Sequence, residues 1–173
     1  MNALRQQGIE NACSDTQDCL VVGAGINGAV AAAALTGRGA KVTVVDKADF
    51  ASFTSQESSN LAWGGIKYLE SYEFGLVWKL CKCRNQLMEA YPGQVREVRF
   101  FTSIAKGFRK PRILLYLGAL LYWFMGRCRT RPPRLLSRKT IRREAPMVDA
   151  SHLTGGMEYS DCYLVKNDTR FAF

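Results

Sequence analysis

A glycine-rich turn between an apolar strand and a helix constrains the fold of this chain more than any other feature of its sequence. The turn, Gly23–Gly28, reads GAGING and directly follows the apolar segment Asp18–Val22. The alanine-rich stretch Ala29–Thr36 predicts a helix, and Lys41–Val45 predicts a second strand that ends at Asp46. A strand, a turn, a helix and a second strand in this order predict a βαβ unit with two parallel strands.

The glycines of this turn have separate expected roles. Gly23 permits the tight turn, Gly25 lets the backbone approach a pyrophosphate, and Gly28 lets the helix pack closely on the strand. The helix N-terminus offers unpaired N–H groups and a partial positive charge to the phosphates. Asp46 lies 18 residues beyond Gly28, where a carboxylate accepts hydrogen bonds from ribose hydroxyls. The unit therefore predicts binding of an adenine dinucleotide, and by itself it does not choose between NAD and FAD.

The segment after Asp46 favours FAD. Residues 48–60 form a Ser/Thr-rich loop, whereas a nicotinamide-binding protein would be expected to continue with a helix. The segment from Asp49 to Glu70 reads DFASFTSQESSNLAWGGIKYLE. It resembles the FAD-dependent glycerol-3-phosphate dehydrogenase/oxidase family, in which this loop reads roughly D-x-A-x-x-T-S-x-x-S-S-K-L-x-H-G-G-L/I-R-Y-L-E. Residues 155–161, GGMEYSD, and 167–170, NDTR, are similar to a second block of that family, G-G-x-x-Y-x-D followed by D-D-A-R.

The resemblance implies FAD as cofactor and oxidation of sn-glycerol 3-phosphate, or a similar small phosphorylated alcohol, to dihydroxyacetone phosphate. A hydride would leave C2 for flavin N5, and the electrons would pass to a quinone, or to oxygen in the oxidase branch. Loop hydroxyls and N–H groups would follow the diphosphate, and a glycine pair would permit close approach to a flat ring. The expected cofactor-binding residues are Gly23, Gly25, Gly28, Asp46, Thr54, Ser55, Ser58, Ser59, Gly64 and Gly65.

By the same resemblance, Lys67 and Tyr68 are expected to bind the phosphate of the substrate. The family has Arg where this chain has Lys67, which keeps the charge and loses the bidentate fork. Trp63 replaces a family His near the flavin, and Lys166 stands where the family usually has Asp. These departures leave the exact substrate open. No catalytic residue is identified, and the general base is expected beyond Phe173.

The rest of the chain predicts helices at residues 72–91 and 112–126, a short basic helix at 137–144, and β-strands at 95–104 and 155–163. The expected fold class is α/β: a Rossmann-like FAD-binding βαβ unit with part of an inserted α+β substrate or cap region. We expect a polar arm over residues 1–17, the βαβ unit with the flavin loop over 18–70, a helical, basic, cap-like segment over 71–154, and the start of the next family block over 155–173.

A doubly wound FAD domain needs more parallel strands than this chain supplies. We therefore expect an incomplete domain, that is, an N-terminal fragment that is inactive by itself.

One local segment carries the excess positive charge. Thirteen basic residues and no acidic residue lie between Val98 and Arg143, and the remainder has 11 basic and 15 acidic residues, a balance of −4. No nucleic-acid-binding motif accompanies the basic segment, so nucleic acid is not an expected partner. A solvated face and an anionic membrane surface remain open, because an apolar helix is flanked by Arg109, Lys110 and Arg112 on one side and by Arg127, Arg129 and Arg131 on the other.

The apolar run Ile113–Gly126 has 14 residues, fewer than the roughly 20 needed to span a bilayer. We therefore expect a cytoplasmic protein that is peripheral on the inner face of the cytoplasmic membrane. No secretory leader is expected, so the six cysteines are expected to be reduced.

Other site chemistries are weakly supported. The chain has no CxxC pair, and His152 is its only histidine, so no metal site is expected. Two alternative functions remain open: a NAD(P)-binding Rossmann protein, and a non-enzymatic basic membrane-binding module.

Overall fold

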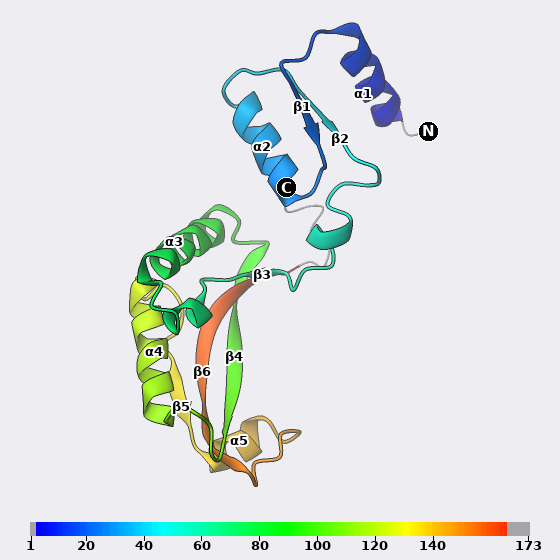
Figure 1. Ribbon diagram of the computed structural model, residues 1–173. Coiled ribbons are helices and arrows are strands. Elements are labelled where there is room, and N and C mark those ends of the chain that lie inside the picture. The colour runs from blue at the N-terminus through cyan, green and yellow to red at the C-terminus, as the bar shows by residue number, and fades with distance from the viewer. Residues whose placement is uncertain (1–2, 166–173) are drawn as a thin grey trace. The chain divides into compact units, whose positions relative to one another are not determined.

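The structure, a computed structural model, describes residues 3–165, which form two compact units (Figure 1). The N-terminal unit contains residues 3–59 and the second unit contains residues 60–165. The sequence predicted a boundary between residues 70 and 71. The division falls earlier because the short strand at residues 61–62 pairs with a strand of the second unit.

The N-terminal unit has the predicted βαβ order. Strands β1 (Cys19–Val22) and β2 (Val42–Val45) pair in parallel, with Cys19 opposite Val42, and helix α2 (Ile26–Thr36) connects them. Helix α2 begins three residues before the predicted Ala29. The Ala29 N–H donates to the Gly25 carbonyl at 2.9 Å, so the last part of the glycine motif belongs to the first helical turn.

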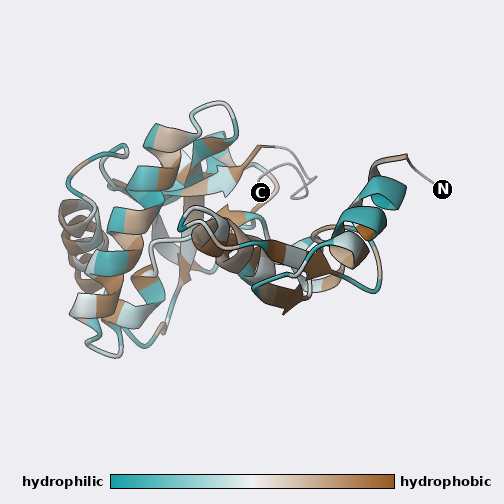
Figure 2. Ribbon diagram, turned by 90° about the horizontal axis from the view of Figure 1, so that it is seen from above, coloured by the Kyte–Doolittle hydropathy of each residue, from teal (hydrophilic) through white to brown (hydrophobic). Residues whose placement is uncertain are grey.

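The segment expected to be a polar arm contains helix α1 (Ala3–Ser14). Figure 2 shows the helix next to the N-terminus mainly in the hydrophilic colour. A hydrogen bond from Gln6 to Glu10, one helical turn apart, supports it. The helix has no apolar stripe, so the periodicity that reveals amphipathic helices gave no signal here.

The second unit is built on an antiparallel sheet. Strand β6 (Leu153–Leu164) is central and pairs with β3 (Leu61–Ala62), β4 (Val95–Ala105) and β5 (Arg134–Leu136). The β4–β6 ladder is long, from Val95 opposite Leu164 to Ala105 opposite Leu153. The predicted strands at residues 95–104 and 155–163 are therefore neighbours, which agrees with the α+β character expected for this region.

Helices α3 (Phe74–Ala90) and α4 (Arg112–Met125) lie together on one side of this sheet (Figure 1). A buried cluster of Val77, Cys81, Tyr122 and Met125 joins them. Helix α5 (Arg138–Glu144) covers a second cluster near the start of β6, and the Ser137 hydroxyl caps it by accepting from the Thr140 N–H at 3.1 Å. All three helices lie within two residues of their predicted ends. No helix within residues 3–165 has the length and apolar character needed to cross a membrane.

The basic segment is largely neutralised by glutamates. Six of its thirteen cations form ion pairs, and the glutamate partners lie on neighbouring elements of the second unit. Arg134, for example, pairs with both Glu144 and Glu158. The partners lie mostly outside the run in sequence, so the local count of charges overstated the positive field of this surface.

Candidate functional site

The glycine turn of the N-terminal unit has the geometry that the spacing predicts. Gly23 has a φ of 110°, which L side chains rarely adopt. A Cβ at Gly28 would collide with the carbonyl oxygen of Gly23, so only glycine lets helix α2 approach β1 this closely. Gly25 is the N-cap residue of α2 and provides no side-chain acceptor. The turn thus leaves the N-terminus of a helix open toward an anion.

Asp46 is fixed beside this turn. Its carboxylate accepts the N–H of Ala24 at 2.7 Å and that of Ala48 at 2.9 Å. These two backbone hydrogen bonds, first that of Ala24 and then that of Ala48, lower the pKa of Asp46 below its ordinary value. A carboxylate has about four acceptor positions, so the ionised group keeps capacity for ribose hydroxyls.

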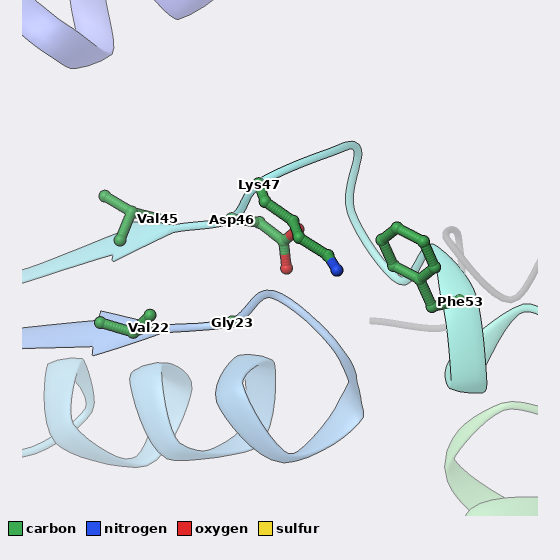
Figure 3. Close-up of a pocket in the computed structure, with 6 residues that line it drawn as sticks. All are labelled: Val22, Gly23, Val45, Asp46, Lys47 and Phe53. Carbon is green, nitrogen blue, oxygen red and sulfur yellow. The ribbon is translucent and has the colours of Figure 1, made fainter.

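An open pocket of about 470 Å³ lies next to Asp46 (Figure 3). Its lining is Val22, Gly23, Val45, Asp46, Lys47 and Phe53. Figure 3 shows the Lys47 side chain reaching toward Phe53, and its ammonium lies 4.4 Å from the centroid of that ring. Apolar walls and an aromatic ring beside a fixed carboxylate suit a flat heterocycle attached to a ribose. Sequence reasoning missed Lys47 and Phe53, because only the fold brings residue 53 back to the ends of β1 and β2.

The Ser/Thr loop returns to the glycine turn at one point. The Ser55 hydroxyl, in the 3₁₀ helix η1 (Phe53–Ser55), accepts the N–H of Ile26 at 3.1 Å. The Ala51 N–H donates to the Ala24 carbonyl at 2.9 Å. Of the four predicted loop hydroxyls, Ser55 is thus at the N-terminus of α2. Thr54, Ser58 and Ser59 are exposed in the same unit.

Residues predicted for the flavin and the substrate lie in the second unit. Gly64 and Gly65 are buried, and Gly65 has a φ of 82°. They lead into the 3₁₀ helix η2 (Ile66–Leu69), which carries the exposed Lys67 and the half-buried Tyr68. The rings of Trp63 and Tyr68 lie 5.6 Å apart between centroids. The fold therefore brings the glycine pair, Trp63, Lys67 and Tyr68 together within one short segment.

A buried polar cluster behind Gly64 was not predicted as part of the site. Asp161 accepts the Gly64 N–H at 3.1 Å, the Tyr122 hydroxyl at 2.7 Å and an Arg84 N–H at 3.3 Å. Burial, the largest influence, raises the pKa of Asp161, and burial together with Asp161 raises the pKa of Tyr122, which keeps its hydroxyl a donor. The available signal was a charged or polar residue on the apolar helices α3 and α4, together with the final Asp of the GGMEYSD block.

Some predicted features lie outside the described residues: Lys166 and the segment NDTR at residues 167–170. The segment after Asp46 bears on the choice of cofactor. A nicotinamide-binding unit predicted a helix there, and residues 46–52 contain only turns and bends before the short η1.

Comparison with known proteins gives a family. The family model described as FAD dependent oxidoreductase matches residues 18–172. The D-erythritol 1-phosphate dehydrogenase of Brucella abortus is 39% identical over 151 residues, which are 87% of this chain and 30% of that protein. The glycerol-3-phosphate dehydrogenase of Pseudomonas tolaasii is 36% identical over 151 residues, which are 87% of this chain and 28% of that protein.

A solved structure shares the fold. The glycerol-3-phosphate dehydrogenase of Bacillus halodurans, complexed with FAD, matches 92% of this chain and 24% of that chain, with a TM-score of 0.63 and 22% identity. The chain therefore spans less than a third of the length of these relatives.

Proposed function

This chain belongs to the FAD-dependent oxidoreductase family, and from that premise we propose that it forms the FAD-binding part of a dehydrogenase for sn-glycerol 3-phosphate or a similar small phosphorylated alcohol. FAD is the cofactor of the family, as the Ser/Thr loop indicated. The single observation that carries the proposal is the Gly23–Gly28 turn, with Asp46 hydrogen-bonded to its backbone and an open helix N-terminus beside it.

Each part of the N-terminal unit is proposed to bind one part of the cofactor. The diphosphate would lie at the first turn of α2, against Gly25 and Ser55, with Thr54, Ser58 and Ser59 nearby in sequence. The adenosine would lie in the pocket, with its ribose hydroxyls on Asp46 and its ring against Phe53. Lys47 adds a positive charge to the same pocket, which suits the negative charge of the dinucleotide.

The second unit is proposed to supply the substrate end. When bound, FAD accepts the hydride from the secondary alcohol, which oxidises glycerol 3-phosphate to dihydroxyacetone phosphate. Gly64 and Gly65 would let the backbone approach the flavin ring, and the ammonium of Lys67 would hold the substrate phosphate beside Tyr68. The reduced enzyme is proposed to pass its electrons to a quinone.

The two relatives' names leave two substrates for the parent enzyme, glycerol 3-phosphate and D-erythritol 1-phosphate. Both are phosphorylated polyols, so the same charged group serves either. We propose glycerol 3-phosphate first. Lys67→Ala is expected to raise KM by about tenfold or more, since a lost charge-assisted hydrogen bond costs about 1.5–3 kcal/mol. An unchanged KM for both substrates would contradict the role of Lys67.

We also propose that the protein is peripheral on the inner face of the cytoplasmic membrane, with helix α4 at an anionic lipid surface. The sequence suggested a helix that is apolar on all sides. One side is buried through Ala119, Tyr122 and Met125, and the other presents an apolar face whose members are 42–67% exposed: Ile113, Leu114, Leu117, Leu121 and Phe124. Arg109 and Arg127 flank its ends, whereas Arg129 pairs with Glu89 and Arg131 with Glu97.

Sedimentation with anionic vesicles tests this membrane contact. Leu117→Ser is expected to weaken binding more than Arg131→Gln, because Arg131 is already paired. Met147→Ser is the matched control, since Met147 is exposed in the same unit away from α4. Equal loss from the Leu117 and Met147 variants, or no binding by the parent at low salt, would contradict the proposal.

The absorption spectrum of the purified protein tests FAD binding. A yellow protein that releases FAD on denaturation is expected. A colourless protein that binds NADH and no flavin would favour the nicotinamide alternative instead.

A further inference from the structure

A buried charged cluster lies behind the Gly64–Gly65 turn of the second unit. It consists of Asp161 on β6, Arg84 and Asn85 on α3, and Tyr122 on α4, and it is called the Asp161 cluster below. The side chain of Asp161 is 0% exposed and that of Arg84 is 2% exposed. Removing both charges from water is costly, and such a pair often adds little to stability over an apolar core. Stability alone is therefore a weak reason for its presence.

The contacts of the cluster converge on one backbone group. Asp161 Oδ1 accepts the Gly64 N–H at 3.1 Å and Arg84 Nη1–H at 3.3 Å, and Oδ2 accepts the Tyr122 hydroxyl at 2.7 Å. Arg84 Nη1 also donates to the Tyr122 oxygen at 3.1 Å. Asn85 accepts from Arg84 and donates to the Gly126 carbonyl at 2.9 Å, which ties the cluster to the end of α4. Two helices and the central strand thus hold the carboxylate that receives the Gly64 N–H.

This hydrogen bond sets the orientation of the turn. A peptide bond is planar, so fixing the Gly64 N–H inward also fixes the Trp63 carbonyl in the opposite direction. A Cβ at Gly64 would collide with the Tyr122 hydroxyl, which leaves no room for another residue. On the following side, the Tyr68 N–H donates to the Gly65 carbonyl at 2.9 Å. The cluster and η2 together leave the glycine pair one backbone arrangement.

We propose that Asp161, held by Arg84 and Tyr122, is a positioning residue for the flavin: it fixes the backbone surface that Gly64 and Gly65 present to the flavin ring. The inference rests on the proposed function, and it adds a set of residues that lie behind the glycine pair. Loss of the Tyr122 hydroxyl loosens the carboxylate and, through it, the Gly64 peptide. The binding and the spectrum of the flavin therefore change although no predicted flavin contact has been removed.

The test compares Tyr122→Phe with Tyr159→Phe in the purified protein. Tyr159 is a matched control, because its ring lies 6.3 Å from that of Tyr122 in the same core but its side chain is outside the cluster. FAD is titrated by fluorescence. Tyr122→Phe is expected to weaken FAD binding by about tenfold and to shift the visible flavin bands, whereas Tyr159→Phe keeps the parent affinity and spectrum.

A second readout needs no flavin. Hydrogen exchange of the Gly64 amide, followed by NMR, is expected to be about tenfold faster in Tyr122→Phe than in the parent. Unchanged exchange, or unchanged FAD affinity and spectrum in a Tyr122→Phe variant of a FAD-binding parent, would overturn the inference alone. A parent that binds no FAD would overturn the proposed function as well, and the exchange data would then show only that the cluster orders the turn.

Discussion

The N-terminal unit and the second unit hold their candidate site residues by different means. Among the described residues of the N-terminal unit only the small Ala24 and Ala51 are buried apolar residues, and Val22 in the pocket is 80% exposed. Its site depends on local backbone geometry. The second unit has two apolar clusters and orders its glycine pair through a buried ion pair. A motif can therefore be encoded locally, whereas the support of a site depends on residues distant in sequence.

The largest expected effect comes from Gly28→Val. The new side chain would collide with the Gly23 carbonyl, so β1 and α2 must separate. We expect a loss of about 3 kcal/mol, enough to disrupt a unit with so little core, and loss of FAD binding. NMR signals of residues 60–165 are expected to stay unchanged.

Gly8→Ala is the control for this variant, because Gly8 lies in α1 with open space around it. It should leave FAD affinity unaltered. A Gly28→Val protein that still binds FAD with the parent affinity would show that the turn does not form the site.

The second prediction concerns the ion pair of the second unit. Arg84→Met is expected to cost about 3–5 kcal/mol in urea unfolding, because it leaves the Asp161 charge buried and unpaired. The double variant Arg84→Met/Asp161→Asn should lose less than the sum of the single losses, since each partner's removal relieves the other. Strict additivity of the two losses would contradict the coupling.

A smaller effect separates two serines at helix N-termini. Ser137 caps α5 and Ser55 accepts the first N–H of α2, so each Ser→Ala change is expected to cost about 1 kcal/mol of stability. Only Ser55→Ala is expected to weaken FAD binding as well. Equal FAD affinity of both variants would place Ser55 outside the site.

The smallest expected effect is a difference in titration between two aspartates. Backbone hydrogen bonds lower the pKa of Asp46, so its contribution to stability is present above pH 3.8 and is lost as the pH falls through its folded pKa. Burial raises the pKa of Asp161, so the stability it contributes when protonated is present below pH 3.8 and is lost as the pH rises through its folded pKa. Carboxyl-carbon NMR titration should place the two midpoints on opposite sides of 3.8. Both midpoints on the same side would contradict this contrast.

The sequence predicted those elements whose signals are local. The βαβ unit follows from the spacing of glycines between two apolar strands, and α3 follows from its leucine spacing and from Pro92. The charged end of β2 identified Asp46 in the same way. These features need no knowledge of distant residues, so the prediction of fold class and of the FAD motif is confirmed.

Features that depend on distant residues were not predicted. The Asp161 carboxylate meets Gly64 across 97 residues and Arg84 across 77 residues. The ion pairs of the basic segment have the same origin, because Glu158 lies beyond it in sequence and on a strand that pairs with β4 and β5. Helix α1 was missed for another reason, since it has no apolar face to produce a period. The roles of the individual site residues stay predictions.

The central claim, that the glycine turn of the N-terminal unit binds FAD, is tested most directly by amide chemical-shift mapping with added FAD. The account predicts shifts concentrated at residues 23–28 and at Asp46, Lys47 and Phe53, and it predicts weaker or no shifts there with NAD. Shifts that avoid this turn, or a turn that responds to NAD and not to FAD, would contradict it.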